Sequence, residues 1–285
     1  MPEGQPRSRF SLAGRSSTLD ARVDAARRDL ADIRLADRVF APHYAVAVPR
    51  TASRAVPLLA RANAPETVQS EVLGGEPFDA LEFSGDHIWG ISPIDGTVGF
   101  VEAAAFTAVF APTHIVAVRS ASIRALPSSD SSVVGTLAMG SRVAAARAGE
   151  SALEVDGGYV DADALLPLGE LALDIATVAE RLVGAPARAG GRSGAGVDAA
   201  GLVFLCLQLA GVEAPRFLDL QAAAMGMALI QEAPFVCGQI LFFEDQAAVV
   251  VDAENAIHVS PDGVARAPIA ALVAAHGTIV RRRQP

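Results

Sequence analysis

The spacing of apolar and polar positions divides the chain into two parts. From about residue 46 to 168, short β-branched runs alternate with Gly, Pro, Ser and Asp, which is typical of short strands joined by tight turns. From residue 171 onward, apolar residues first recur every three or four positions and then form strand-like runs. The pattern predicts an all-β portion followed by an α+β portion.

The β portion contains one internal repeat. Residues 60–76 correspond to residues 123–141, and the two copies close on the similar runs 98–104 and 157–163. A repeat of about 60 residues built from short strands predicts two small barrels. We therefore expect four segments along the chain: a lead segment 1–45, a first barrel 46–110, a second barrel 111–168 and an α+β domain 171–285.

Three helices are expected in the last segment. Residues 175–183 follow a helical period, with Asp174 as N-cap, and Asp198 can cap a nearly all-apolar helix at 199–209. A helix that is apolar all round is expected to be buried. The third helix is predicted at 218–224, and strands are predicted at 235–243, 247–251 and 256–259. Helices first and a meandering sheet afterwards define an α+β domain.

Composition and charge narrow the possible functions. The chain of 285 residues is 51% hydrophobic with a net charge of −9, so we expect a folded acidic protein that binds neither nucleic acid nor membrane. All 23 basic residues are arginine, which excludes a lysine Schiff base or a P-loop. The basic run 281–283 is expected to be a solvated tail.

The few cysteines and histidines indicate a reducing, cytoplasmic location and no metal site. Cys206 and Cys237 are too few for a disulfide framework. The five histidines lack partners at ligand spacing. No cofactor is predicted. The most apolar stretch, about residues 201–212, is shorter than the roughly 20 residues that a membrane span needs.

The segment 190–203 carries a family resemblance. It reads Gly-Gly-Arg-Ser-Gly-Ala-Gly-Val-Asp-Ala-Ala-Gly-Leu-Val and resembles the Gly-Gly-Arg-Thr…Asp-Cys-Ser-Gly-Leu-Val stretch of the NlpC-type cell-wall endopeptidases. These papain-like enzymes cut γ-D-glutamyl bonds in peptidoglycan peptides. The resemblance implies a papain-like domain preceded by two bacterial SH3-like domains. Trp89 is interpreted first as a half-buried strand aromatic of a small barrel, and the resemblance offers a place in the cleft wall as the alternative.

The same resemblance assigns the site positions. The nucleophile position falls on Ala199, the base position on Gln246 and the orienting position on His258. Asp198 would meet the substrate amine, and Asp219 would complete the ligand shell. The predicted ligand-binding set is therefore Asp198, Ala199, Asp219, Gln246 and His258.

Two of these residues lack the chemistry that the family uses. A methyl group cannot attack a carbonyl, and an amide has no titratable nitrogen with which to act as a base. Cys206 lies seven positions further along the same helix, about 10 Å deeper at 1.5 Å per residue, and Cys237 has no base near it in sequence. Ser193 lies in the right loop without an identified base.

Three interpretations follow from these residues. The leading one is a pseudoenzyme, not an enzyme, that binds a muropeptide or short peptide, or associates with an active homologue or with itself. The alternative is an active hydrolase of cell-wall peptides that uses an unrecognised nucleophile. The third is a structural or oligomerisation protein.

Overall fold

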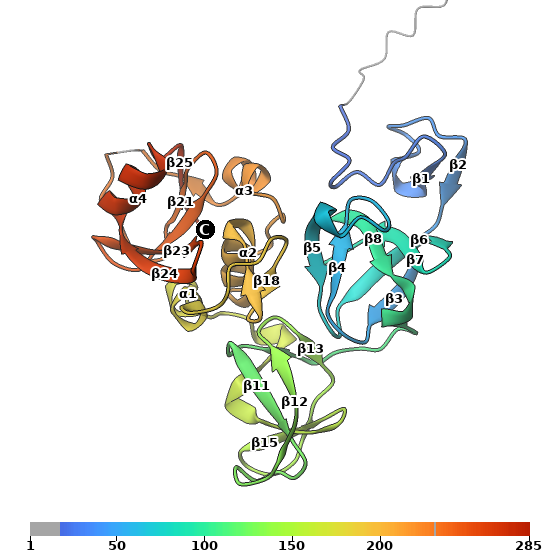
Figure 1. Cartoon of the computed structure of the whole chain (residues 1–285), viewed down its shortest axis with the longest axis horizontal. Coiled ribbons are helices and arrows are strands. Elements are labelled where there is room, and N and C mark those ends of the chain that lie inside the picture. The colour runs from blue at the N-terminus through green and yellow to red at the C-terminus, as the bar shows by residue number, and fades with distance from the viewer. Residues whose placement is uncertain (1–17, 231) are drawn as a thin grey trace, which may run out of the picture.

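The computed structural model describes residues 18–230 and 232–285. Residues 1–17 of the predicted lead segment lie outside this range. Figure 1 shows three bodies: the described part of the lead segment lies on a first β body, a second β body lies below, and the helices with the last sheet form the third. We call them the first β unit (residues 48–107), the second β unit (114–167) and the C-terminal unit (175–284).

The lead segment forms a small parallel pair of strands, β1 (Leu30–Asp32) and β2 (His43–Ala45). It packs on the first β unit through Arg27, whose guanidinium carbon lies 4.3 Å from the centre of the Trp89 ring. Trp89 is buried beneath it and is only 3% exposed. Trp89 therefore belongs to the core between these two segments, which agrees with its interpretation as a strand aromatic and not with a place in the cleft wall.

The first β unit is one open sheet with the strand order β5-β4-β8-β7-β6-β3-β9. Alternate residues of its strands bury an apolar cluster that includes Leu58, Phe78 and Ile88. Its strands are β3 (Val48–Ala52), β4 (Val56–Leu59), β5 (Val68–Val72), β6 (Pro77–Ser84), β7 (His87–Ile91), β8 (Val98–Glu102) and β9 (Phe106–Thr107).

The second β unit has a three-stranded and a five-stranded sheet, with the orders β13-β10-β17 and β12-β11-β16-β15-β14. Its strands are β10 (His114–Val116), β11 (Ser120–Arg124), β12 (Val133–Ala138), β13 (Arg142–Val143), β14 (Ala146–Arg147), β15 (Ala152–Val155), β16 (Gly158–Asp161) and β17 (Leu165–Pro167). Across the described residues, neither β unit closes into a barrel, so the prediction of two small barrels is not confirmed.

The C-terminal unit places helices beside a six-stranded sheet of order β20-β25-β21-β22-β23-β24. Its helices are α1 (Ile175–Leu182), α2 (Ala199–Leu209), α3 (Leu218–Ala224) and α4 (Ile269–His276). Its strands are β18 (Arg192–Ser193), β19 (Gly196–Val197), β20 (Met227–Ala228), β21 (Ile240–Phe242), β22 (Ala247–Val250), β23 (Asn255–Ser260), β24 (Gly263–Pro268) and β25 (Arg281–Gln284). The mixed α and β composition and the meander agree with the sequence prediction.

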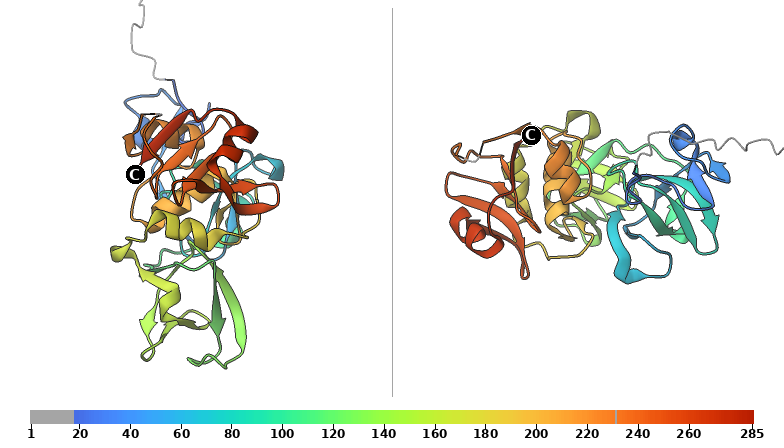
Figure 2. Two further views of the ribbon diagram at one scale, coloured as in Figure 1. Left: turned by 90° about the vertical axis from the view of Figure 1, so that its left-hand side faces the viewer. Right: turned by 90° about the horizontal axis from the view of Figure 1, so that it is seen from above.

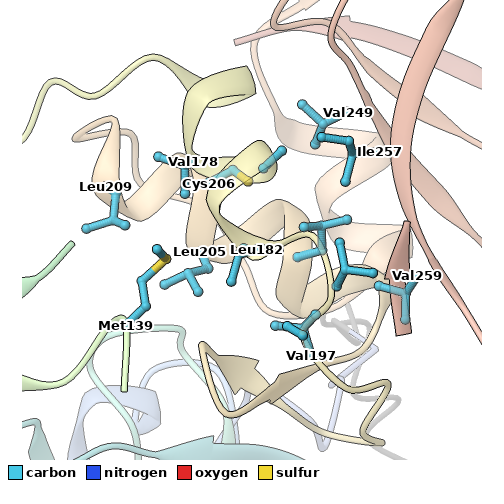
Figure 3. Packing of buried hydrophobic residues seen from close by; sticks show 14 of the residues in the cluster. Met139, Val178, Leu182, Val197, Leu205, Cys206, Leu209, Val249, Ile257 and Val259 are labelled. Carbon is cyan, nitrogen blue, oxygen red and sulfur yellow. The ribbon is translucent and has the colours of Figure 1, made fainter. Parts of the chain in front are cut away.

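The largest apolar cluster surrounds α2. Figure 3 shows Leu205, Cys206 and Leu209 of this helix packed between α1 and the sheet strands β22 and β23. Met139 of the second β unit packs into the same cluster and is fully buried. Since ten of the eleven α2 residues are buried, the helix is the central element of this unit. No helix of the described residues is long and apolar enough to cross a membrane.

The predicted solvated tail at residues 281–283 is instead the sheet strand β25, paired with β20 and β21. Arg282 is 2% exposed. Its guanidinium donates to the carbonyls of Ala233 and Pro234 and to the side-chain oxygen of Gln239. Sequence reasoning failed here because a run of arginines looks solvated unless its partners, about 40 to 50 residues away in the chain, are known.

Candidate functional site

The start of α2 is fixed by Asp198. Its Oδ1 accepts a hydrogen bond from the Gly201 amide at 2.7 Å, as an N-cap residue does. Its Oδ2 accepts from the Gly190 amide at 2.9 Å and from the Arg216 guanidinium at 2.6 Å. The predicted site residue Asp198 therefore joins the glycine-rich loop to the first turn of α2.

The glycines of this loop allow close backbone approach. Gly190 has φ +69°, and a Cβ on it would lie 2.6 Å from the Val68 side chain of β5. A Cβ on Gly201 would lie 1.9 Å from the Gly191 carbonyl oxygen. Any larger residue would push the loop off β5 or off the helix. The loop is therefore held between the first β unit and α2.

A buried network of ion pairs holds the two units together at this point. Arg192 and Glu76 are both fully buried and form two hydrogen bonds, of 3.0 and 2.5 Å. The Arg192 Nε also lies 3.0 Å from Asp95. Burial opposes ionisation of Asp95, but the charge of Arg192 and a hydrogen bond from Ser70 lower its pKa. The network gives each buried charge a partner, as low-dielectric surroundings require.

A cavity of about 230 Å³ opens beside this network. We call it the cleft cavity. Its walls are Val56, Pro57, Val68, Ser70 and Glu71 of the first β unit and Arg188, Gly190 and Gly191 of the loop before α2. A ligand in this cavity would contact both the first β unit and the C-terminal unit. It would also lie next to Gly191, whose backbone packs on the first turn of α2.

Ala199 is the first residue of α2 and is half-buried. In the described part of the chain, the amides of Ala199 and Ala200 have no hydrogen-bond partner. Amides at the start of a helix are electropositive donors. The start of α2 therefore carries two amides without an acceptor in the described chain, although Ala200 is buried and residue 199 supplies only a methyl group.

Gln246 lies in a turn of the sheet and His258 on one of its strands. Gln246 stands in the turn between β21 and β22, and its Nε2 donates to the Val259 carbonyl at 2.8 Å. His258 lies on β23 opposite Ala248, with its ring 6.2 Å from that of His276 on α4. Burial and the neighbouring His276 lower the pKa of His258, which favours the neutral form of its ring.

Asp219 lies on α3 and is engaged by the lead segment. The Arg22 guanidinium donates to both of its oxygens, at 3.0 and 2.6 Å, and stacks on Phe217 with its carbon 4.6 Å from the ring centre. Hydrogen bonding from Arg22 lowers the pKa of Asp219. Because the Arg22 carbonyl accepts from the Val98 amide of the first β unit, this residue bridges that unit and the C-terminal unit.

The two thiols differ in exposure, and both have a raised pKa. Cys206 is fully buried in the α2 cluster, as Figure 3 shows, and burial raises the pKa of its thiol. Cys237 is exposed as a residue. Partial desolvation of its sulfur and the negative charge of Asp174 nevertheless raise the pKa of its thiol. Ser193 is buried, and its hydroxyl accepts from Arg188. Neither thiol has the lowered pKa of an activated nucleophile.

The structure thus divides the five predicted ligand-binding residues into groups. Asp198 and Ala199 stand together at α2, Asp219 is paired with the lead segment, and Gln246 and His258 lie on the sheet. Among the described residues, no hydrogen bond or ion pair joins Asp198 or Asp219 to the two sheet residues. No group of three or more potential metal ligands is present in residues 18–230 and 232–285.

Sequence reasoning missed the arginines that surround the site. Arg188, Arg192 and Arg216 contact acids that lie 18 to 117 residues away in the chain. A dyad of Asp245 and His276, with 3.6 Å between oxygen and ring nitrogen, was also missed. The sequence contained one indication of these buried ion pairs, namely that all of its basic residues are arginine, which is the residue favoured in buried ion pairs.

No protein-family model matches the sequence, and no curated protein is significantly similar to it. The structure is similar to that of an NlpC/P60 family protein from Bacillus cereus ATCC 10987, with a TM-score of 0.72 and 14% identity over 84% of this chain and 100% of that one. An NlpC/P60 endopeptidase from Photobacterium damselae subsp. piscicida gives a TM-score of 0.51 and 12% identity over 77% and 64%. The chain therefore shares the fold of NlpC/P60 proteins.

This comparison corrects one prediction. Residues 199 and 246 lack a thiol and an imidazole and so predict a pseudoenzyme, but the solved structures that share this fold include one described as an endopeptidase, and the pseudoenzyme prediction is not supported.

Proposed function

We propose that this protein is a hydrolase of short cell-wall peptides, in which the nucleophile is a group other than the side chain of residue 199. The observation that carries the proposal is the fold shared with an NlpC/P60 family protein over 84% of the chain. The endopeptidase from Photobacterium damselae points to the same class.

The start of α2 supports a role in acyl chemistry. The unpartnered amides of Ala199 and Ala200 would polarise the scissile carbonyl, because preorganised donors stabilise the charge that develops on oxygen. Asp198 holds this turn in place through the Gly190 and Gly201 amides. The cleft cavity next to the loop supplies space for the peptide.

The expected rate follows from the missing thiol. When the nucleophile of a serine peptidase is removed, binding and the oxyanion donors alone retain about 10³–10⁴-fold acceleration over water. We therefore expect the protein to accelerate hydrolysis of a γ-D-glutamyl-diamino acid peptide by about 10³–10⁴-fold over water. The attacking group in this reaction would not come from residue 199.

The test is product formation by the purified full chain, followed by mass spectrometry. A matched variant is Ala199→Pro, since proline is favoured at the first position of a helix and removes one amide donor without removing the helix. Loss of one such donor costs about 10²–10³ in rate. Absence of any hydrolysis above buffer by the unmodified protein contradicts the proposal.

A further inference from the structure

Three carboxylates belong to the cleft cavity wall or to the predicted ligand shell, and each already binds an arginine of this chain. The pairs are Asp198 with Arg216 at 2.6 Å, Glu71 with Arg188 at 2.5 Å and Asp219 with Arg22 at 2.6 Å. The resemblance to the endopeptidases had assigned Asp198 to a substrate amine. In this structure the negative charge of Asp198, which would bind the amine, is already neutralised by Arg216.

The acceptor capacity of Asp198 is also nearly filled. Its Oδ2 accepts two hydrogen bonds and its Oδ1 accepts one, while an ionised carboxylate has about four acceptor positions. Arg216 is 1% exposed, so a ligand cannot displace it without leaving a buried charge unpaired, which is strongly unfavourable. A ligand ammonium would therefore gain one hydrogen bond and no net ion pair.

Glu71 is closed to a ligand amine in the same way. It is 5% exposed, its Oε2 accepts from Arg188, and its Oε1 accepts from the Arg192 amide. The Arg188 side chain, in contrast, is 44% exposed and lines the cleft cavity. Within the described part of the chain, its Nη1 makes no hydrogen bond, so it can donate to a ligand oxygen.

The remaining wall of the cavity is largely apolar, and it includes Val56, Pro57 and Val68. Because Glu71 neutralises Arg188, the cavity suits an uncharged oxygen better than a carboxylate, which Glu71 would repel. An acyl group has the matching features, namely a carbonyl oxygen to accept from Arg188 and a hydrocarbon part to pack on the apolar wall.

We propose that the cleft cavity binds the N-acylated end of a short peptide and discriminates against a free amino terminus. Arg188 donates to the acyl oxygen, and Val56 and Pro57 contact the acyl hydrocarbon. The proposal rests on the proposed function for the peptide class and specifies which form of that peptide the protein takes.

The test is titration calorimetry on the full chain with two probes. One is a γ-D-glutamyl-diamino acid dipeptide extended by N-acetylated alanine, and the other is the same peptide with a free alanine amine. We expect the acetylated probe to bind at least about tenfold more tightly, which corresponds to about 1.4 kcal/mol. Arg188→Met should remove this preference. Arg147→Met, at an exposed arginine on β14 of the second β unit, is the charge-matched control and should retain it.

The outcomes separate this inference from the proposed function. Equal or tighter binding of the free amine, or an unchanged preference in Arg188→Met, overturns the inference and leaves hydrolysis open to its own test. Tight binding of the acetylated probe without cleavage supports the inference and counts against hydrolysis. Binding of neither probe overturns both.

Discussion

Arg192 of strand β18 and Glu76 of the first β unit form a doubly hydrogen-bonded ion pair in which both side chains are fully buried. The pair connects two segments that are 116 residues apart in the chain. It lies directly before the loop that carries Asp198, so the position of the candidate site depends on contact between the first β unit and the C-terminal unit.

Breaking this pair should strongly destabilise the fold. In Glu76→Gln, the buried Arg192 keeps Asp95 but loses the counter-charge of its doubly hydrogen-bonded partner, and the expected loss in unfolding free energy is about 3–5 kcal/mol. The measurement is urea unfolding of the full chain. The control is Glu102→Gln in the half-exposed pair with Arg54, which should cost about 0–1 kcal/mol. Equal effects of the two variants would contradict this account of the network.

Restoring the thiol and the imidazole should increase hydrolysis. The double variant Ala199→Cys with Gln246→His places a thiol at the electropositive start of α2 and an imidazole in the turn after β21. We expect cleavage of the γ-D-glutamyl probe to rise at least about 10²-fold over the unmodified chain. The single variants are controls and should each give less. No gain in the double variant would show that Gln246 does not reach the start of α2.

The two thiols should differ in their rates of alkylation. Cys237 is exposed, whereas Cys206 is fully buried, so iodoacetamide should modify only Cys237 in the folded protein. Since the thiolate is the reactive form and the pKa of Cys237 is raised, its modification should be slow at pH 7 and should accelerate as the pH rises. Peptide mapping by mass spectrometry checks both points, with Cys237→Ser as control. Labelling of Cys206 without denaturant would contradict the buried placement.

The contact between Arg22 and Asp219 should depend on pH. The folded pKa of Asp219 is lowered by its hydrogen bonds from Arg22, so its contribution to stability is present above the ordinary carboxyl pKa of about 3.9 and is lost as the pH falls through the folded value. Asp219→Asn should therefore be less stable than the unmodified chain at pH 7 by about 0–1 kcal/mol, because the pair is partly exposed. The difference should vanish at low pH. Thermal unfolding at both pH values measures it, and a difference that persists at low pH would refute the assignment.

The sequence predicted those parts of the fold that depend on local patterns. Asp174 and Asp198 cap α1 and α2 as expected, because an N-cap bonds to an amide three residues away. The sequence did not predict β25, because the residues that bind Arg282 lie in other segments of the chain. The residues Asp198 and Ala199 located the candidate site in the sequence. The charge of Asp198 is neutralised by Arg216, which lies 18 residues further along the chain, and no local sequence pattern predicts such a pair.

Met139 of the second β unit completes the apolar cluster around α2, together with Ile115 of the same unit. The left view of Figure 2 shows this unit extending below the C-terminal unit. If the C-terminal unit were produced alone, the side chains that contact Met139 would face water and attract other copies of the chain. The second β unit therefore supplies part of the interior of the C-terminal unit, and the two are expected to melt together in one cooperative transition.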